Sequence, residues 1–213
     1  KTETAQPHYY KVYLADYDTT VEITPTNRAA QFRFTFPETD KAYLLLDAFF
    51  KGSKVQVLPQ ERKIIGYTRN NSGGVPENFH NYFVITFDKD FESVQTWSNG
   101  YKLSNKPESE GEHTGAVIGF RTKKGEQITA KVASSFISPA QALLNLQTEL
   151  GNDTFEQTQR KAFALWEAEL GKIQVEDENI DHLRTFYSCL YRTLLFPRTF
   201  YEYNKEGKMV HYS

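Results

Sequence analysis

The sequence predicts a mainly β protein, an antiparallel β-sandwich followed by helices at the C-terminal end. Two observations predict this class. Strand-like runs recur over the first two-thirds of the 213 residues, with turn clusters between them at residues 16–18, 25–27 and 37–40. Helix-capping residues then occur at Ser138, after which apolar residues repeat at three- and four-residue steps.

The predicted strands are rich in β-branched and aromatic residues. They cover residues 11–14, 20–23, 31–36, 42–46, 54–58, 62–69, 81–88, 93–97, 115–122 and 126–136. In 31–36, Phe32, Phe34 and Phe36 alternate with polar residues, which predicts one buried face and one face in water. Residues 123–126, which include Gly125, are expected to turn the last two strands into a hairpin.

Residues 103–115 are predicted to be a solvated loop. They contain Glu108, Glu110 and Glu112 and few apolar residues. A run of acidic residues of this kind is more typical of plain surface than of a metal site.

Three helices are expected after residue 137. Ser138 caps the first helix, with Pro139 at its first position and Gln141 placed to reach back to the cap. Its apolar positions are Ala140, Leu143, Leu144 and Leu150.

Asp153 or Thr154 caps the second helix. Its inner face is expected to hold Ala162, Phe163, Trp166 and Leu170, with Trp166 as a core or interdomain residue rather than a sugar platform.

The third helix carries the most regular apolar pattern of the chain. Its predicted buried face consists of Ile180, Leu183, Phe186, Tyr187, Leu190 and Leu194. Pro197 should end it, because proline cannot donate the helical hydrogen bond. Cys189 lies among these apolar residues and is predicted to be an inert, buried thiol.

Composition excludes several classes of protein. Charged residues make up 24% of the chain and the net charge is -2, so no basic field for nucleic acid exists. No apolar run approaches the roughly 20 residues that cross a bilayer. The chain opens at Lys1 without a methionine or a signal-peptide pattern, so we expect that processing or truncation removed the true start.

Read without any comparison, the sequence contains no complete active site. Asp16 with Asp18, and Asp88 with Asp90, are the close carboxylate pairs, and both pairs resemble turn residues at strand ends. The histidines lack metal-ligand spacing. They are His8, His80, His113, His182 and His211. We therefore predict no catalytic residue and no metal ligand within these 213 residues.

Three segments, in the same order along the chain, resemble one family. Residues 82–88 read YFVITFD, and residues 134–138 read SSFIS ahead of Ala140, Ala142, Asn145, Leu146 and Glu149. The third segment combines YRTLLFPR at 191–198, FYE at 200–202 and HYS at 211–213. Together they resemble the bacterial exo-acting α-mannosidases of glycoside hydrolase family 92.

The resemblance implies a three-part organisation. Residues 1–137 would form a sandwich domain of the supersandwich type, incomplete at its N-terminus, and residues 138–175 a helical linker. Residues 176–213 would supply the first helix and loop of a truncated (α/α)₆ catalytic barrel. For the start at Lys1, the resemblance favours truncation over processing.

The resemblance also implies a function. The full-length protein would be a calcium-dependent, inverting exo-α-mannosidase of bacterial origin, secreted or periplasmic, acting on mannose-containing glycans. Its catalytic acid and base and its calcium ligands would lie beyond Ser213, so the chain alone is expected to be inactive without the rest of the polypeptide. His211 and Tyr212 are the predicted substrate-binding residues, because each can bond a sugar hydroxyl and offer an apolar face to the ring. The alternative is a non-catalytic β-sandwich module that binds glycan or protein, which an aromatic content of 15% permits.

Overall fold

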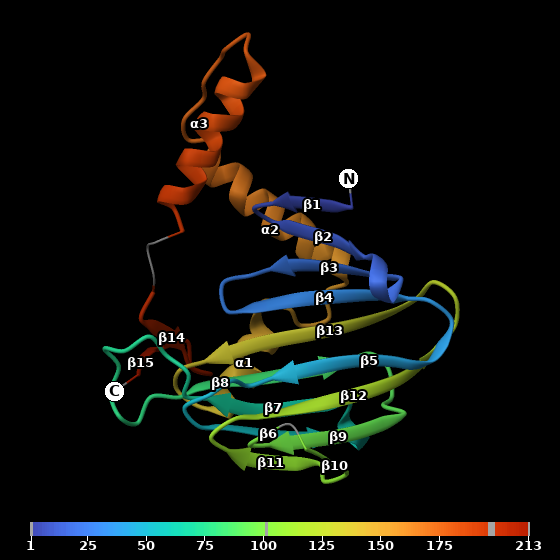
Figure 1. The fold of residues 1–213 in the computed structure, drawn as a ribbon. Coiled ribbons are helices and arrows are strands. Elements are labelled where there is room, and N and C mark those ends of the chain that lie inside the picture. Colours follow the sequence, from blue (N-terminus) through green and yellow to red (C-terminus); the bar gives the residue numbers. More distant parts are fainter. Residues whose placement is uncertain (1, 101, 196–198, 213) are drawn as a thin grey trace.

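Two antiparallel sheets lie face to face in the computed structural model, which describes residues 2–100, 102–195 and 199–212 (Figure 1). Among these residues the larger sheet has the order β1-β2-β3-β4-β13-β8-β7-β6-β11 and the smaller one β10-β9-β12-β5. The strands of the larger sheet are β1 (Glu3–Gln6), β2 (Tyr9–Leu14), β3 (Thr19–Pro25), β4 (Ala29–Phe36), β6 (Ser53–Leu58), β7 (Lys63–Thr68), β8 (Asn81–Phe87), β11 (Glu108–Gly111) and β13 (Glu126–Ser135). Those of the smaller sheet are β5 (Thr39–Asp47), β9 (Ser93–Ser98), β10 (Leu103–Ser104) and β12 (Thr114–Thr122). The predicted antiparallel sandwich is confirmed.

Alternating side chains fill the space between the two sheets. Val55, Ile64, Ile118, Phe120 and Ile128 are each at most 1% exposed. Burying side chains of this kind stabilises the fold by roughly 1.5–3 kcal/mol each. The period of two seen in β6, where every second residue is buried, is what directs these side chains to one face.

The smaller sheet covers only part of the larger one. The core cluster between the sheets includes residues of β4–β9, β12 and β13 but, among the described residues, none of β1, β2 or β3. β5 forms an edge of the smaller sheet, and a mostly apolar groove of about 500 Å³ runs between it and β2–β4. Leu14, Val21, Phe34 and Leu45 line this groove.

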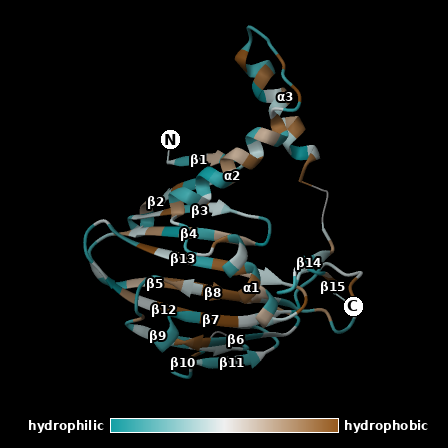
Figure 2. Cartoon of the chain, turned by 180° about the vertical axis from the view of Figure 1, so that it is seen from behind, coloured by the Kyte–Doolittle hydropathy of each residue, from teal (hydrophilic) through white to brown (hydrophobic). Residues whose placement is uncertain are grey.

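Helix α1 (Pro139–Glu149) packs on the other face of the larger sheet, against β13 and β8 (Figure 2). The Ser138 hydroxyl accepts the Gln141 amide at 3.1 Å, so the predicted cap is confirmed. The buried side chains of this helix are Gln141, Ala142, Asn145 and Leu146. Two of them are polar, and their bonds to neighbouring segments are described below.

Helix α2 (Phe155–Leu170) covers β3 and β4. A capping box between Thr154 and Gln157 starts it. Below it, Gln31 is fully buried, and its side-chain amide donates to the Thr158 hydroxyl at 2.7 Å and to the Asp153 carbonyl at 3.1 Å. The prediction that the polar face of residues 31–36 lies in water was therefore wrong, because α2 covers it.

Helix α3 (Ile180–Thr193) projects away from the sheets (Figure 1). None of its residues is buried, and Cys189 is exposed, so the predicted buried face and buried thiol were both wrong for this chain. Its contact with the preceding helix runs through the Trp166 and Tyr191 rings, 5.0 Å apart. The predicted helix end at Pro197 lies outside the described residues.

The segment 103–115 is not a loop throughout, which corrects the prediction made from its acidic composition. β11 pairs with β6, with Glu108 opposite Gln56 and Glu110 opposite Lys54, and it forms an outer edge of the larger sheet. Lys54 bridges both glutamates, at 2.7 Å to Glu108 and 3.3 Å to Glu110. Charges at a sheet edge are compatible with strand structure and discourage edge-to-edge pairing.

Candidate functional site

The two predicted substrate-binding residues lie on or beside a hairpin that follows α3. Its strands are β14 (Tyr201–Tyr203) and β15 (Met209–His211), and Tyr201 pairs with His211. The Asn204 side chain caps the turn by accepting the amides of Glu206 at 3.1 Å and Lys208 at 2.9 Å. Gly207 has a φ of +70°, a conformation that glycine adopts readily. The Gly207 amide donates to the Asn204 carbonyl at 2.9 Å, which closes the turn at residues 204–207.

One buried carboxylate fastens this hairpin to the sandwich. Glu202 is 4% exposed and lies at the junction between β13 and α1. One of its oxygens accepts the Ser135 hydroxyl at 3.0 Å and the Phe136 amide at 2.9 Å, and the other accepts the Asn145 side-chain amide at 2.6 Å. These bonds compensate for the loss of water around the charge.

Backbone carbonyls of the hairpin are held as well. The Gln141 side-chain amide donates to the Tyr203 carbonyl at 2.7 Å. Arg28 donates to the Tyr201 carbonyl, and to the Thr199 hydroxyl at 2.8 Å. Strand β14 is thus tied to α1 on one side and to the turn before β4 on the other.

A hollow of about 580 Å³ lies beside the hairpin. Arg28, Phe136, Tyr201, Tyr203 and Tyr212 are among the residues that line it. A side-chain hydrogen bond with Tyr201 raises the pKa of the Tyr203 phenol. A cavity that combines aromatic faces with phenol and guanidinium groups can bind a polyhydroxylated ligand.

The structure places the two predicted residues in different surroundings. Tyr212 lines the hollow, donates its hydroxyl to the Asn78 side-chain oxygen at 3.0 Å, and lies edge-on to Phe79. His211 is exposed, and its ring meets that of Tyr201 at 6.3 Å between centroids. Among the described residues His211 does not line the hollow, so the role of either residue in binding stays a prediction.

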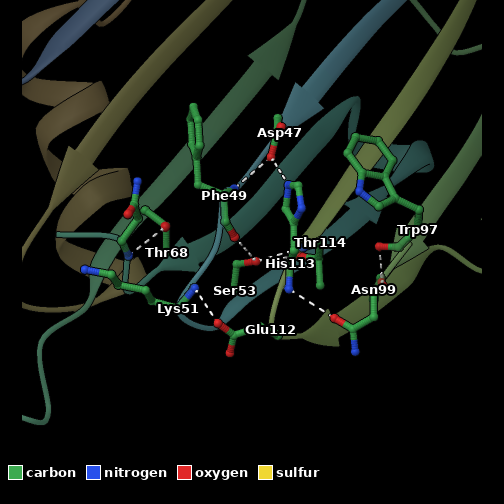
Figure 3. Close-up of polar contacts among 12 residues, drawn as sticks. Asp47, Phe49, Lys51, Ser53, Thr68, Trp97, Asn99, Glu112, His113 and Thr114 are labelled. Atoms are coloured by element: carbon green, nitrogen blue, oxygen red, sulfur yellow. Dashed lines mark hydrogen bonds and ion pairs between the residues drawn. The ribbon is translucent and has the colours of Figure 1, made fainter. Parts of the chain in front are cut away.

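Sequence reasoning missed a histidine–aspartate pair that lies where β5 ends and β12 begins (Figure 3). The buried His113 ring lies 2.6 Å from an oxygen of Asp47, which also accepts the Phe49 amide at 2.8 Å. The Phe50 ring packs on the imidazole, 4.1 Å between centroids. No sequence signal could have found the pair, because 66 residues separate its members.

This pair stabilises an unusual loop rather than completing a catalytic triad. Phe49 and Lys51 have φ values of +62° and +71°, which costs about 1–2 kcal/mol for each non-glycine residue. The nearby Ser53 hydroxyl donates to the Phe49 carbonyl and bonds the Thr114 hydroxyl, both at 2.9 Å. Ser53 therefore holds the loop at residues 49–51 against the start of β12.

One member of each carboxylate pair noted in the sequence forms a hydrogen bond near a strand end. Asp18 accepts the Tyr13 hydroxyl at 2.8 Å, and Asp88 accepts the Thr129 amide at 2.9 Å. Within the described ranges no group of three or more His, Cys, Asp or Glu side chains is arranged to hold a metal ion. In the same ranges no helix is both long and apolar enough to cross a bilayer.

Comparison with family models gives two adjacent matches. Residues 1–135 match the glycosyl hydrolase family 92 N-terminal domain, and residues 141–213 match the glycosyl hydrolase family 92 catalytic domain. A comparison with curated proteins gives no match.

Two solved structures similar to this chain come from Bacteroides thetaiotaomicron. The family GH92 inverting mannosidase BT2199 of strain VPI-5482 is 39% identical, with a TM-score of 0.95 over 100% of this chain. The family GH92 α-mannosidase BT3965, solved in complex with mannoimidazole, is 32% identical, with a TM-score of 0.82 over 99% of this chain. The 213 residues span 29% of the length of each of these relatives.

Proposed function

Because the chain belongs to glycosyl hydrolase family 92, we propose that the whole protein is an exo-acting α-mannosidase that releases terminal α-linked mannose from glycans with inversion. The observation that carries this proposal is the similarity to an inverting mannosidase over 100% of the chain, at 39% identity. The match to a second mannosidase, solved with mannoimidazole, supports a mannose-shaped substrate pocket in the whole protein.

Inverting hydrolysis needs a general acid and a general base about 6.5–9.5 Å apart, with room for a water between them. Asp18 accepts the Tyr13 hydroxyl and Asp88 accepts the Thr129 amide, so both carboxylates are engaged within the sandwich. We propose that the acid and the base lie in the part of the whole protein that is not included in these 213 residues. The sandwich (1–137), the linker (138–175) and the first catalytic segment (176–213) then support that site.

We propose that calcium is bound by the whole protein rather than by these 213 residues alone. When bound, such a hard cation would hold sugar hydroxyls through oxygen ligands. The described acidic side chains do not gather into a set that fits it. We therefore assign no calcium ligand to this chain, and we place the enzyme in the bacterial periplasm or outside the cell as a further proposal.

The hairpin supplies the residue-level part of the proposal. Tyr212 lines the hollow beside it and His211 is exposed on the neighbouring strand, so a mannoside that extends over the hairpin would contact both. Phenol and imidazole can each bond a sugar hydroxyl while an aromatic face packs on the ring.

The test is made in the full-length protein. Replacing His211 with Ala, or Tyr212 with Ala, should lower kcat/KM for an α-mannoside more than about tenfold, equivalent to roughly 1.4 kcal/mol. Glu206→Gln, in the exposed turn of the same hairpin, is the matched control and should retain wild-type kinetics.

Two outcomes would contradict the proposal at different levels. Wild-type kinetics in both variants, with only a lower melting temperature, would make the hairpin structural. A full-length protein that binds mannosides without releasing mannose would instead favour the non-catalytic module.

A further inference from the structure

Glu202 of the β14–β15 hairpin is a charged residue in a buried position, which is costly unless its carboxylate is hydrogen-bonded. Its carboxylate is 4% exposed, and the groups that bond it come from β13, the following turn and α1. They are the Ser135 hydroxyl, the Phe136 amide and the Asn145 side-chain amide. An isolated hairpin of three-residue strands is marginally stable in water, so its position depends on these bonds.

The donor from α1 is fixed in orientation. Asn145 donates from the same nitrogen to the Ser134 carbonyl at 2.9 Å, while its oxygen accepts the Gln141 amide at 3.0 Å. Turning this amide over would break both bonds. Gln141 also donates to the Tyr203 carbonyl, so helix and hairpin share one connected network around Glu202.

The hairpin in turn determines where the predicted binding residues lie. Tyr212 follows β15 directly and bonds Asn78, and His211 pairs with Tyr201, one residue from Glu202. A shift of β14 relative to β13 would therefore move both side chains together. Misplacements of about 1 Å can lower enzymatic rates about a hundredfold.

We propose that Glu202 is a positioning residue: its buried carboxylate locks the β14–β15 hairpin to the β13–α1 junction and so holds Tyr212 and His211 in place for the sugar. The inference rests on the mannosidase function proposed above. Glu202 does not touch the substrate, because its oxygens are occupied inside the junction.

The first experiment replaces Glu202 with Gln in the full-length protein. Whichever way the new amide turns, its NH₂ faces a donor, either the Asn145 NH₂ or the Phe136 amide, so two donors meet where a bond existed. Amides of residues 201–211 should exchange hydrogen at least about tenfold faster, while those of 53–58 in β6 remain unchanged. The exposed Glu206→Gln should leave both segments unchanged.

The kinetic experiment separates positioning from a general loss of stability. Glu202→Gln should lower kcat/KM for an α-mannoside about tenfold, mainly through a higher KM. In a His211→Ala, Tyr212→Ala background the same change should cost less than about twofold, because the side chains that it displaces are already absent. Ser135→Ala, which removes one donor and leaves two, should act in the same direction by about threefold and serves if Glu202→Gln does not fold.

The outcomes are distinguishable. Full activity or unchanged exchange at 201–211 in Glu202→Gln would overturn the positioning role, as would an equal tenfold loss in the double-variant background. A wild-type protein that cleaves no mannoside would overturn the proposed function, and the kinetic part of the inference with it. In that case the exchange measurement still decides whether Glu202 anchors the hairpin.

Discussion

At the scale of residues, Glu22 and Arg33 hold four elements together, namely β2, β3, β4 and α2. The Arg33 guanidinium makes two bonds of 2.8 Å to the two oxygens of Glu22, and the Tyr9 hydroxyl donates to the same carboxylate at 2.6 Å. The guanidinium also packs over the Phe155 ring, 4.2 Å from its centroid, and pairs with Glu156 at the start of α2. A planar guanidinium suits this combination of bidentate bonding and stacking, so lysine could not replace it.

Glu22 should make stability depend on pH in the acid range. Burial opposes its charge, but the hydrogen bonds from Arg33 and Tyr9 outweigh that effect and hold its pKa below the usual 4.5. Because the folded pKa is the lower one, the carboxylate stabilises the fold above pH 4.5, and this contribution is lost as the pH falls through the folded value.

We expect Glu22→Gln to lower the free energy of unfolding at pH 7 by about 2 kcal/mol, and to flatten its decline below pH 4.5. Urea unfolding at a series of pH values measures both effects. Glu3→Gln, on the exposed edge strand β1, is the control. An unchanged acid profile in Glu22→Gln would show that the Arg33 pair contributes nothing to the pH dependence.

At the scale of elements, one glycine of a strand is covered by an aromatic ring from the neighbouring strand. Gly115 of β12 pairs with Trp97 of β9, whose side chain is 3% exposed. An ideal Cβ on Gly115 would lie 1.9 Å from a Trp97 ring atom and 2.4 Å from the Leu46 carbonyl oxygen. The ring therefore fits only because the side chain opposite it is a hydrogen atom.

Gly115→Ala should lower the free energy of unfolding by about 3 kcal/mol, because both the indole and the β5 backbone would have to move. Gly111→Ala is the matched control: the atoms nearest its new Cβ would be side-chain atoms of Ser98 and Asn99, and it should cost less than about 1 kcal/mol. Denaturant unfolding of the two variants measures the difference. Equal values would show that the indole can move aside without a penalty.

At the scale of the whole molecule, the two sheets are unequal. The edge of β5 and the inner face of β2–β4 border an apolar groove of about 500 Å³, and Leu45 beside it is 68% exposed. Helix α3 adds further apolar residues without burying any of its own (Figure 2). Unpaired strand edges and exposed apolar surface favour association with other chains.

The 213-residue chain should therefore self-associate and bind a hydrophobic dye. Leu45→Lys should reduce both, because a charge on an edge strand discourages pairing. Leu165→Lys removes a similarly exposed leucine from α2, away from that edge, and should have a smaller effect. Light scattering and dye fluorescence measure the result, and a monomeric wild-type chain that excludes the dye would contradict the prediction.

The sequence by itself determined the elements whose signal is local. The alternation of Phe32, Phe34 and Phe36 predicted a strand and its inward face, and Ser138 predicted the start of α1, because strand period and helix capping depend on residues a few positions apart. The motifs at 82–88, 134–138 and 191–213 likewise identified the family, which the family matches show.

Only the tertiary structure decided what each surface meets. It buried Gln31 under α2, paired β11 with β6 and left Cys189 exposed on α3. It also joined Asp47 to His113, and Glu202 to Ser135 and Asn145, across separations of 57 to 67 residues. Such contacts produce no periodic pattern in the sequence. Whether a side chain is buried or hydrogen-bonded depends on how distant segments of the chain pack together.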